Sequence, residues 1–98
     1  MKLIVIIPAY NEEKTIEKAI KLVPKKIKNI KKVQVLVVDD GSIDRTAELA
    51  KKNKAIVVSH NINKGVGSAF QTGIDKALEL KADIMVNIDA DGQFDSQE

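Results

Sequence analysis

The chain has 98 residues, the length of one small domain with a single hydrophobic core. Charged residues make up 31% and hydrophobic residues 44%, as in soluble globular proteins, and the net charge of +2 is too small to indicate nucleic-acid binding. Aromatic residues make up only 3% and cysteine is absent, which excludes the stacking surfaces of single-strand binders, disulfides, thiolate zinc sites and cysteine nucleophiles.

The sequence also bears on membrane contact. Its longest uninterrupted apolar run covers residues 3–7, far short of the ~20 residues that a membrane-spanning helix needs, and no signal-peptide pattern precedes it. We therefore expect a cytoplasmic protein, and any contact with a membrane to be peripheral or to come from sequence outside these residues. A lysine cluster before the second predicted strand is either a solvated connection or a patch for anionic lipid or phosphate; its members are Lys25, Lys26, Lys28, Lys31 and Lys32.

Short runs rich in Val and Ile predict β-strands over residues 3–7, 33–38, 55–59 and 83–88. They largely lack polar alternation, which is typical of strands covered on both faces. Between them, apolar residues recur at helical spacing over 16–23 and 66–78, and a shorter helix over 44–52 has Ser42 or Asp44 as its expected N-cap. The expected apolar stripe of the last helix comprises Val66, Ala69, Phe70, Gly73, Ile74, Ala77 and Leu78.

This alternation predicts an α/β fold, namely an open, mostly parallel β-sheet with right-handed crossovers and helices on both faces. In such sheets ligands bind beyond the carboxyl ends of the strands. The unusual residues follow the four predicted strands, at 8–12, 39–42, 60–65 and 89–93, so we expect one site at that edge. Residues 95–98 resemble the first turn of a helix, and we expect the fold to continue beyond them.

The first predicted strand ends in Pro8 and Ala9, which are followed by Tyr10, Asn11 and Glu12. Tyr10 offers a flat surface to a nucleobase, and Glu12 can accept hydrogen bonds from ribose hydroxyls or a base edge. The alternative is an ordinary helix start, in which Asn11 is the N-cap and the acids lie in the first turn.

The second predicted strand ends in Asp39 and Asp40, two adjacent carboxylates that repel each other unless donors or cations meet them. One of them can accept donors from a nucleobase while the other binds neighbouring backbone amides. An Asp-Gly-Ser sequence is also ordinary turn chemistry, so a purely structural role stays open.

The third predicted strand leads into a loop of residues 61–67 that has glycines, Lys64 and a following helix N-terminus, as phosphate-binding loops do. It lacks the Walker A order, and Phe70 stands where a dinucleotide fingerprint needs a small residue. Lys64 either contacts a phosphate or is a surface lysine. His60, the only histidine, is interpreted as a hydrogen-bonded structural residue rather than a base.

The last predicted strand is followed by Asp89-Ala90-Asp91-Gly92-Gln93. Two carboxylates one residue apart at a strand end suit Mg²⁺ or Mn²⁺, which prefer oxygen ligands and often share them with substrate phosphates. An EF-hand loop is excluded because Phe94 stands where that loop needs glycine. A structural Asp-Gly turn remains the alternative.

The motifs, in chain order, are Ile7-Pro8-Ala9-Tyr10-Asn11-Glu12, Val38-Asp39-Asp40-Gly41-Ser42, Asn63-Lys64-Gly65 and Asp89-Ala90-Asp91-Gly92-Gln93. Together they resemble family 2 glycosyltransferases of GT-A fold, whose sheet is Rossmann-like, and the last motif resembles the polyprenyl-phosphate (dolichol-phosphate) mannosyl- and glucosyltransferases most. The resemblance implies a base and ribose pocket lined by Pro8, Tyr10, Glu12, Val38 and Asp40. It also implies ribose and diphosphate contacts from Asp89, Ala90 and Asp91, and a metal held by Asp91 and Gln93 with Asp89 nearby. Ala9, Asn11, Asp39 and Lys64 complete the predicted substrate-binding set.

The resemblance further implies metal-dependent transfer of a sugar from a GDP- or UDP-sugar to a polyprenyl phosphate or glycan. We assign no catalytic residue, because such families draw acceptor contacts and any base from a second half. The isolated chain is expected to bind nucleotide with little or no transfer, and uncovered apolar faces would favour self-association. The rival hypothesis is a non-catalytic regulatory α/β module similar to response-regulator receivers, but the receiver acid positions here hold Pro8-Ala9-Tyr10 and Ser59-His60.

Overall fold

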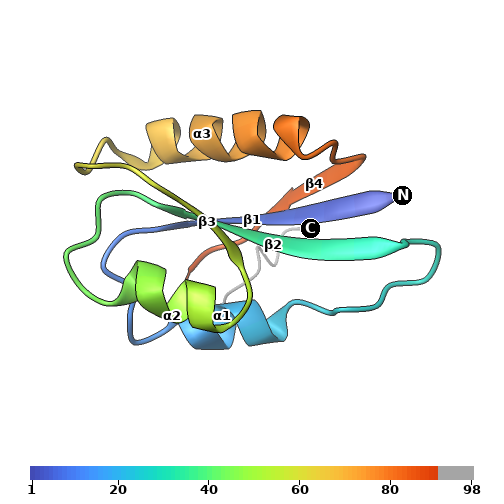
Figure 1. Ribbon diagram of the computed structural model, residues 1–98, viewed down its shortest axis with the longest axis horizontal. Coiled ribbons are helices and arrows are strands. Elements are labelled where there is room, and N and C mark those ends of the chain that lie inside the picture. Colours follow the sequence, from blue (N-terminus) through green and yellow to red (C-terminus); the bar gives the residue numbers. More distant parts are fainter. Residues whose placement is uncertain (91–98) are drawn as a thin grey trace.

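The computed structural model describes residues 1–90, which form a four-stranded sheet with helices on both faces (Figure 1). The strands lie in the order β3-β2-β1-β4, and each neighbouring pair is parallel. Helices α1 and α2 cover one face, and α3 covers the other (Figure 1). The predicted open parallel α/β fold is confirmed. Its elements are β1 (Lys2–Ala9), α1 (Ile16–Leu22), β2 (Lys32–Asp39), α2 (Thr46–Lys52), β3 (Ile56–Ser59), α3 (Val66–Glu79) and β4 (Ile84–Asn87).

The packing of β1 on both of its faces explains why its sequence is a continuous apolar run. Its side chains alternate between the two layers: Val5 and Ile7 pack on the side of α1 and α2, whereas Ile4 and Ile6 pack on the side of α3. All four are buried, because β1 lies between β2 and β4 and both faces are covered. A strand in that position needs apolar residues on both faces.

Helix α3 lies close to the sheet because the residues that face it are small. Ala69, Gly73 and Ala77 are buried, and a Cβ atom placed on Gly73 would lie only 2.6 Å from Cγ2 of Ile6. The broad stripe expected from the sequence is therefore wrong at its margins. Val66, Phe70 and Leu78 are 77%, 42% and 59% exposed, because a helix that touches the sheet along a narrow strip leaves its flanking side chains in solvent.

Two helix starts also differ from the expectation. Helix α2 begins at Thr46, and its N-cap position holds Arg45 rather than Ser42 or Asp44. The Asp44 side chain nevertheless accepts the Thr46 backbone N–H at 2.9 Å. Asp44 thus satisfies a free backbone donor of the first helical turn although it precedes the N-cap residue. Asn11 does not cap α1, which begins at Ile16; its Oδ1 instead accepts the N–H of Ile43 at 2.9 Å.

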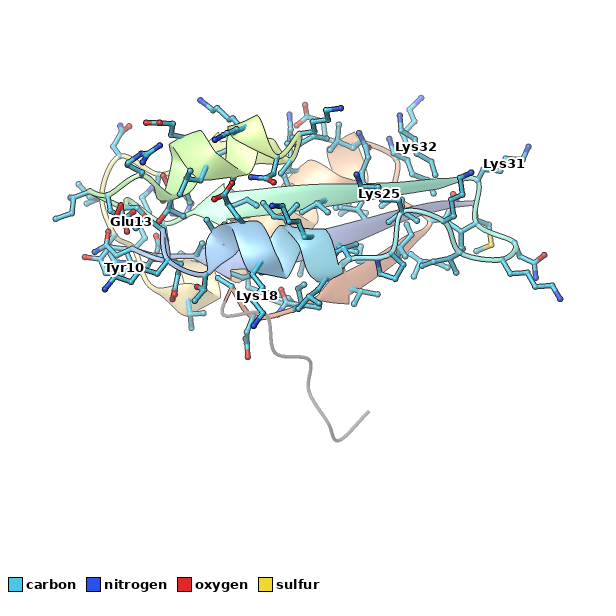
Figure 2. The ribbon with its side chains drawn as sticks, turned by 90° about the horizontal axis from the view of Figure 1, so that it is seen from below. Tyr10, Glu13, Lys18, Lys25, Lys31 and Lys32 are labelled. Carbon is cyan, nitrogen blue, oxygen red and sulfur yellow. The ribbon has the colours of Figure 1, made fainter. Side chains whose placement is uncertain are left out.

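The lysine cluster is exposed; it lies on the connection from α1 to β2 and ends at Lys32, the first residue of β2. Figure 2 shows Lys25, Lys31 and Lys32 toward the opposite end of the molecule from Tyr10 and Glu13. The cluster is thus separate from the edge where the strands end. Within residues 1–90, no helix has the length and apolar character needed to cross a membrane.

Candidate functional site

A cleft of about 470 Å³ opens at the carboxyl ends of the strands. One side is built by the residues that end β1 and by the segment after β4, which continues along β1 through the hydrogen bond from Ile88 N–H to Ile6 O at 3.0 Å. The other side comes from the loop before α3 and from the first turn of that helix. The lining residues are Pro8, Ala9, Tyr10, Glu12, Asp40, Asn63, Gly65, Val66, Ala69, Asp89 and Ala90.

The cleft brings together most of the predicted site, from three different strand ends. Among the predicted residues, the lining includes Pro8, Ala9, Tyr10, Glu12, Asp40, Asp89 and Ala90. Asp91 and Gln93 lie outside the described residues. Four lining residues were not predicted. Asn63 and Gly65 belong to the loop that resembled a phosphate-binding loop, whereas Val66 and Ala69 were expected in the apolar stripe of the helix.

The remaining predicted residues lie elsewhere, for local reasons. The side chain of Val38 is wholly buried in the core beneath α3, and Asn11 is committed to the loop after β2. Lys64 is exposed, and its backbone N–H donates to Asp40. Asp39 is turned toward Ser42 and Ser59, away from the cleft. Their contact with a substrate stays a prediction.

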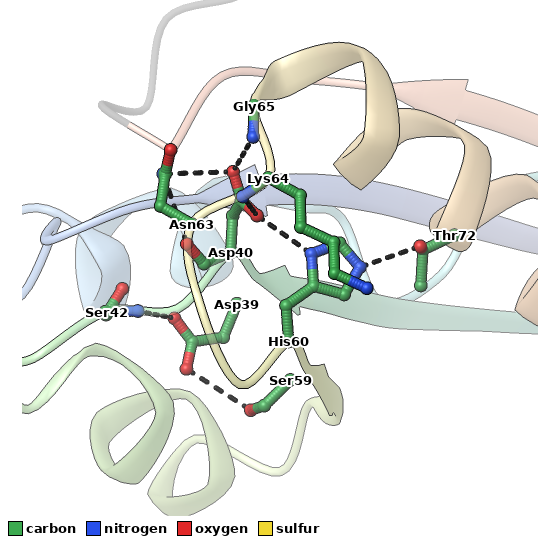
Figure 3. Close-up of polar contacts among 9 residues, drawn as sticks. All are labelled: Asp39, Asp40, Ser42, Ser59, His60, Asn63, Lys64, Gly65 and Thr72. Atoms are coloured by element: carbon green, nitrogen blue, oxygen red, sulfur yellow. Dashed lines mark hydrogen bonds and ion pairs between the residues drawn. The ribbon is translucent and has the colours of Figure 1, made fainter.

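Asp40 is the best-connected polar residue of the site (Figure 3). Its Oδ1 accepts the Lys64 N–H at 2.8 Å and lies 2.8 Å from Nδ1 of His60. Its Oδ2 accepts the Gly65 N–H at 2.9 Å and an Asn63 side-chain N–H at 3.1 Å. Burial raises the pKa of this carboxyl, but the donors from Lys64, His60 and Gly65 outweigh it and hold the pKa below its ordinary value.

His60 is enclosed, and both of its ring nitrogens have partners. Its side chain is only 8% exposed, and Nε2 lies 2.8 Å from the Thr72 hydroxyl on α3 while Nδ1 faces Asp40 (Figure 3). The ring lies between Asp40 and Thr72 and does not line the cleft. The predicted hydrogen bonding of the lone histidine is thus present, and its assignment as a structural residue rather than a base stays a prediction.

Asp39 and Asp40 avoid mutual repulsion because each has its own donors. Asp39 accepts the Ser42 N–H at 3.0 Å and the Ser59 hydroxyl at 3.2 Å. The turn between them and Ser42 needs glycine: Gly41 has φ +77°, and a Cβ there would lie 2.4 Å from the backbone carbon of Ile62. The loops after β2 and β3 are thus packed backbone against backbone.

The residues after β1 are fixed by the loop that precedes α2 and by the first residue of that helix. The N–H of Asn11 donates to the Ser42 hydroxyl at 2.8 Å, and the N–H of Glu12 donates to the Thr46 hydroxyl at 2.8 Å. These bonds use backbone donors; Tyr10 is 46% exposed, and both Tyr10 and Glu12 line the cleft. The cleft thus has both an aromatic residue and a carboxylate in its lining, and Oε2 of that carboxylate accepts the Thr15 hydroxyl at 3.3 Å.

Asp89 is the described member of the predicted metal set, and it lines the cleft with an exposed carboxylate. Among residues 1–90, no group of three histidine, cysteine or acidic side chains could hold a metal ion. The two other predicted ligands, Asp91 and Gln93, follow just after this part of the chain. Their oxygen donors and that of Asp89 suit Mg²⁺ or Mn²⁺ in chemistry.

Comparisons with known proteins give the family. The model of glycosyl transferase family 2 matches residues 4–98. A UDP-N-acetylglucosamine–dolichyl-phosphate N-acetylglucosaminyltransferase of Methanococcus voltae is 43% identical over 90% of this chain and 40% of its own. A polyprenol monophosphomannose synthase of Mycolicibacterium smegmatis is 34% identical over 97% of this chain and 37% of its own.

The fold agrees with these relatives. A mannosyltransferase from Pyrobaculum calidifontis, solved in complex with GDP-Man and Mn²⁺, superposes with a TM-score of 0.78 at 28% identity, over 91% of this chain and 27% of that one. The chain thus spans two fifths or less of the length of the relatives named here. The resemblance seen in the motifs is confirmed, and the chain belongs to glycosyl transferase family 2.

Proposed function

We propose that this chain supplies the donor-binding part of a glycosyltransferase that moves a sugar from a nucleotide-diphosphate sugar to a polyprenyl phosphate or a glycan. The observation that carries the proposal is the cleft itself, where an exposed aromatic ring, three acids and a helix start converge from separate strand ends. Its volume of about 470 Å³ falls within the range of small-molecule sites. The names of the relatives support both a nucleotide sugar and a polyprenyl-type acceptor.

Each lining residue has a role that its chemistry suits. Tyr10, together with Pro8, offers a flat apolar surface to the base, and the Glu12 carboxylate accepts hydrogen bonds from ribose hydroxyls. Ala90 is buried and small, so the sugar or diphosphate can lie against its backbone. We leave the choice between UDP and GDP to experiment, because the named relatives include one of each nucleotide.

A divalent cation, Mg²⁺ or Mn²⁺, would be held by Asp89, Asp91 and Gln93. When bound there with a diphosphate, such a cation neutralises the charge that develops on the leaving nucleoside diphosphate. The position of Asp89 in the cleft and its exposed carboxylate support this assignment. Mn²⁺ in the Pyrobaculum calidifontis mannosyltransferase complex agrees with it.

The acceptor and the place of action are the least constrained parts of the proposal. We assign no catalytic base to this chain, since His60 does not line the cleft. We propose a cytoplasmic protein that meets its polyprenyl phosphate by peripheral contact with the membrane. A regulatory α/β module of the receiver type gains no support from the relatives that the chain matches.

Calorimetric titration with UDP and with GDP, each with Mn²⁺, tests donor binding. We expect heat with at least one nucleotide, and we expect Glu12→Gln to weaken its affinity by about tenfold to a hundredfold. Glu79→Gln is the matched control, because it removes the same charge from an exposed position at the end of α3. A folded chain that gives no heat with either nucleotide would overturn the proposal.

A further inference from the structure

We propose that His60 is a positioning residue for the nucleotide cleft. Its ring fixes the Asp40 carboxylate, and Asp40 in turn holds the loop of residues 63–65 that forms one wall. The consequence for nucleotide binding rests on the proposed function, whereas the geometry can be tested without any nucleotide. His60 does not line the cleft, and none of the proposed donor-binding roles depends on it.

The Asp40 carboxylate is the point where separate segments meet (Figure 3). Asp40 follows β2, His60 follows β3, and Asn63, Lys64 and Gly65 lead into α3. An ionised carboxylate has about four lone-pair positions. The His60 ring, the Lys64 and Gly65 amides and the Asn63 side chain each supply one contact, at 2.8 to 3.1 Å. Asp40 therefore acts on the cleft through the loop that it binds.

The protonation of His60 follows from these partners. An ionised Asp40 can only accept, so the facing Nδ1 of His60 must carry a proton. In the neutral ring, Nε2 is then free to accept the Thr72 hydroxyl, which lies 2.8 Å away on α3. The imidazole thus connects β2, β3 and α3, and its enclosed position leaves little space for another rotamer.

The loop that depends on this arrangement forms part of the cleft wall. Asn63 and Gly65 line the cleft, and Gly65 occupies the N-cap position of α3 with φ +100°. Val66 and Ala69, which follow in the first turn, line the cleft as well. If Asp40 lost the His60 donor, the carboxylate could turn away from the Lys64 and Gly65 amides, and this wall would lose its shape.

Nitrogen NMR of the unmodified chain is the first test, since His60 is the only histidine and its signals need no separation from others. At neutral to mildly alkaline pH we expect Nδ1 to give the signal of a protonated nitrogen. An unprotonated Nδ1, as in the opposite tautomer, would overturn the proposal. This readout depends neither on a nucleotide nor on the folding of a variant.

Amide hydrogen exchange in variants is the second test. His60→Leu removes the donor, and we expect exchange at the Lys64 and Gly65 amides to become about tenfold faster or more. His60→Asn places an amide N–H near the former Nδ1 and should restore slow exchange. Asn61→Ala is the control, because this neighbour is exposed and lies outside the cleft lining. Unchanged exchange at the Lys64 and Gly65 amides in a folded His60→Leu variant would contradict the proposal. If His60→Leu fails to fold, fast exchange at these amides in His60→Asn would contradict it instead.

Nucleotide affinity then joins the geometry to function. We expect His60→Leu to weaken UDP or GDP binding by about tenfold or more, with His60→Asn close to the unmodified chain and Asn61→Ala unchanged. Faster loop exchange with full affinity would overturn the positioning role. If the unmodified chain binds no nucleotide, the donor-binding proposal fails by itself, while the tautomer and exchange data still decide whether His60 holds Asp40 and the loop.

Discussion

Substitution of Gly73 by alanine tests how closely α3 lies on the sheet. The added Cβ would lie 2.6 Å from Cγ2 of Ile6 and 3.2 Å from Cγ2 of Val38, both on fully buried, branched side chains that have little room to move. Overpacking of this kind costs about 1–3 kcal/mol. The same substitution gains up to about 1 kcal/mol from helix propensity, so the measured loss is smaller than the steric cost.

Gly67→Ala separates the two effects. Gly67 lies on the same helix, but a Cβ there meets no atom within 4 Å, so this variant carries the propensity gain without the clash. We expect Gly73→Ala to be less stable than Gly67→Ala by about 1–3 kcal/mol in urea unfolding followed by circular dichroism. In a domain of this size, each kcal/mol corresponds to about 4–8 °C in Tm. Equal stability of the two variants would refute the close packing of α3 described here.

Three further predictions concern the site and the sheet edge. Asp40→Asn should lower the free energy of unfolding by about 1–3 kcal/mol, since the new side-chain amide group would face hydrogen-bond donors. This difference from the unmodified chain should shrink on acidification. The pKa of Asp40 is lowered from 3.8, so the stabilisation by its carboxylate is present above about pH 4 and is lost as the pH falls through the lowered pKa. Unfolding curves measured across that pH range would check this, and a constant difference would contradict it. EDTA should weaken nucleotide binding, and Asp89→Asn should reproduce this loss even with Mn²⁺ present; calorimetry that shows equal affinity with and without the chelator would exclude the proposed metal. Within residues 1–90, β4 pairs with β1 alone and exposes Val86, so its other edge is open to a second chain. We therefore expect self-association that increases with concentration, measured by light scattering. A monomer mass that stays constant with concentration would contradict this expectation.

The order and type of the elements could be predicted from the sequence alone. Apolar runs without alternation, such as residues 3–7, require cover on both faces, and helical periodicity between such runs leaves a parallel sheet as the simple solution. Parallel strands bring their carboxyl ends to one edge, and for this reason Tyr10, Asp40 and Asp89 could be assigned to one cleft before any coordinates were known.

The partners of each polar group were decided only by the tertiary structure. Asp40 receives its donors from residues 20 to 25 positions further along the chain, and no local pattern shows whether a carboxylate there meets a ligand or the protein. The margins of α3 are a second example. Periodicity marks one face of a helix, but the width of the strip that touches the sheet depends on the distance between the layers, which Gly73 allows to be short. Such distances are set by the volumes of side chains that meet from different elements, and a linear sequence does not say which ones meet.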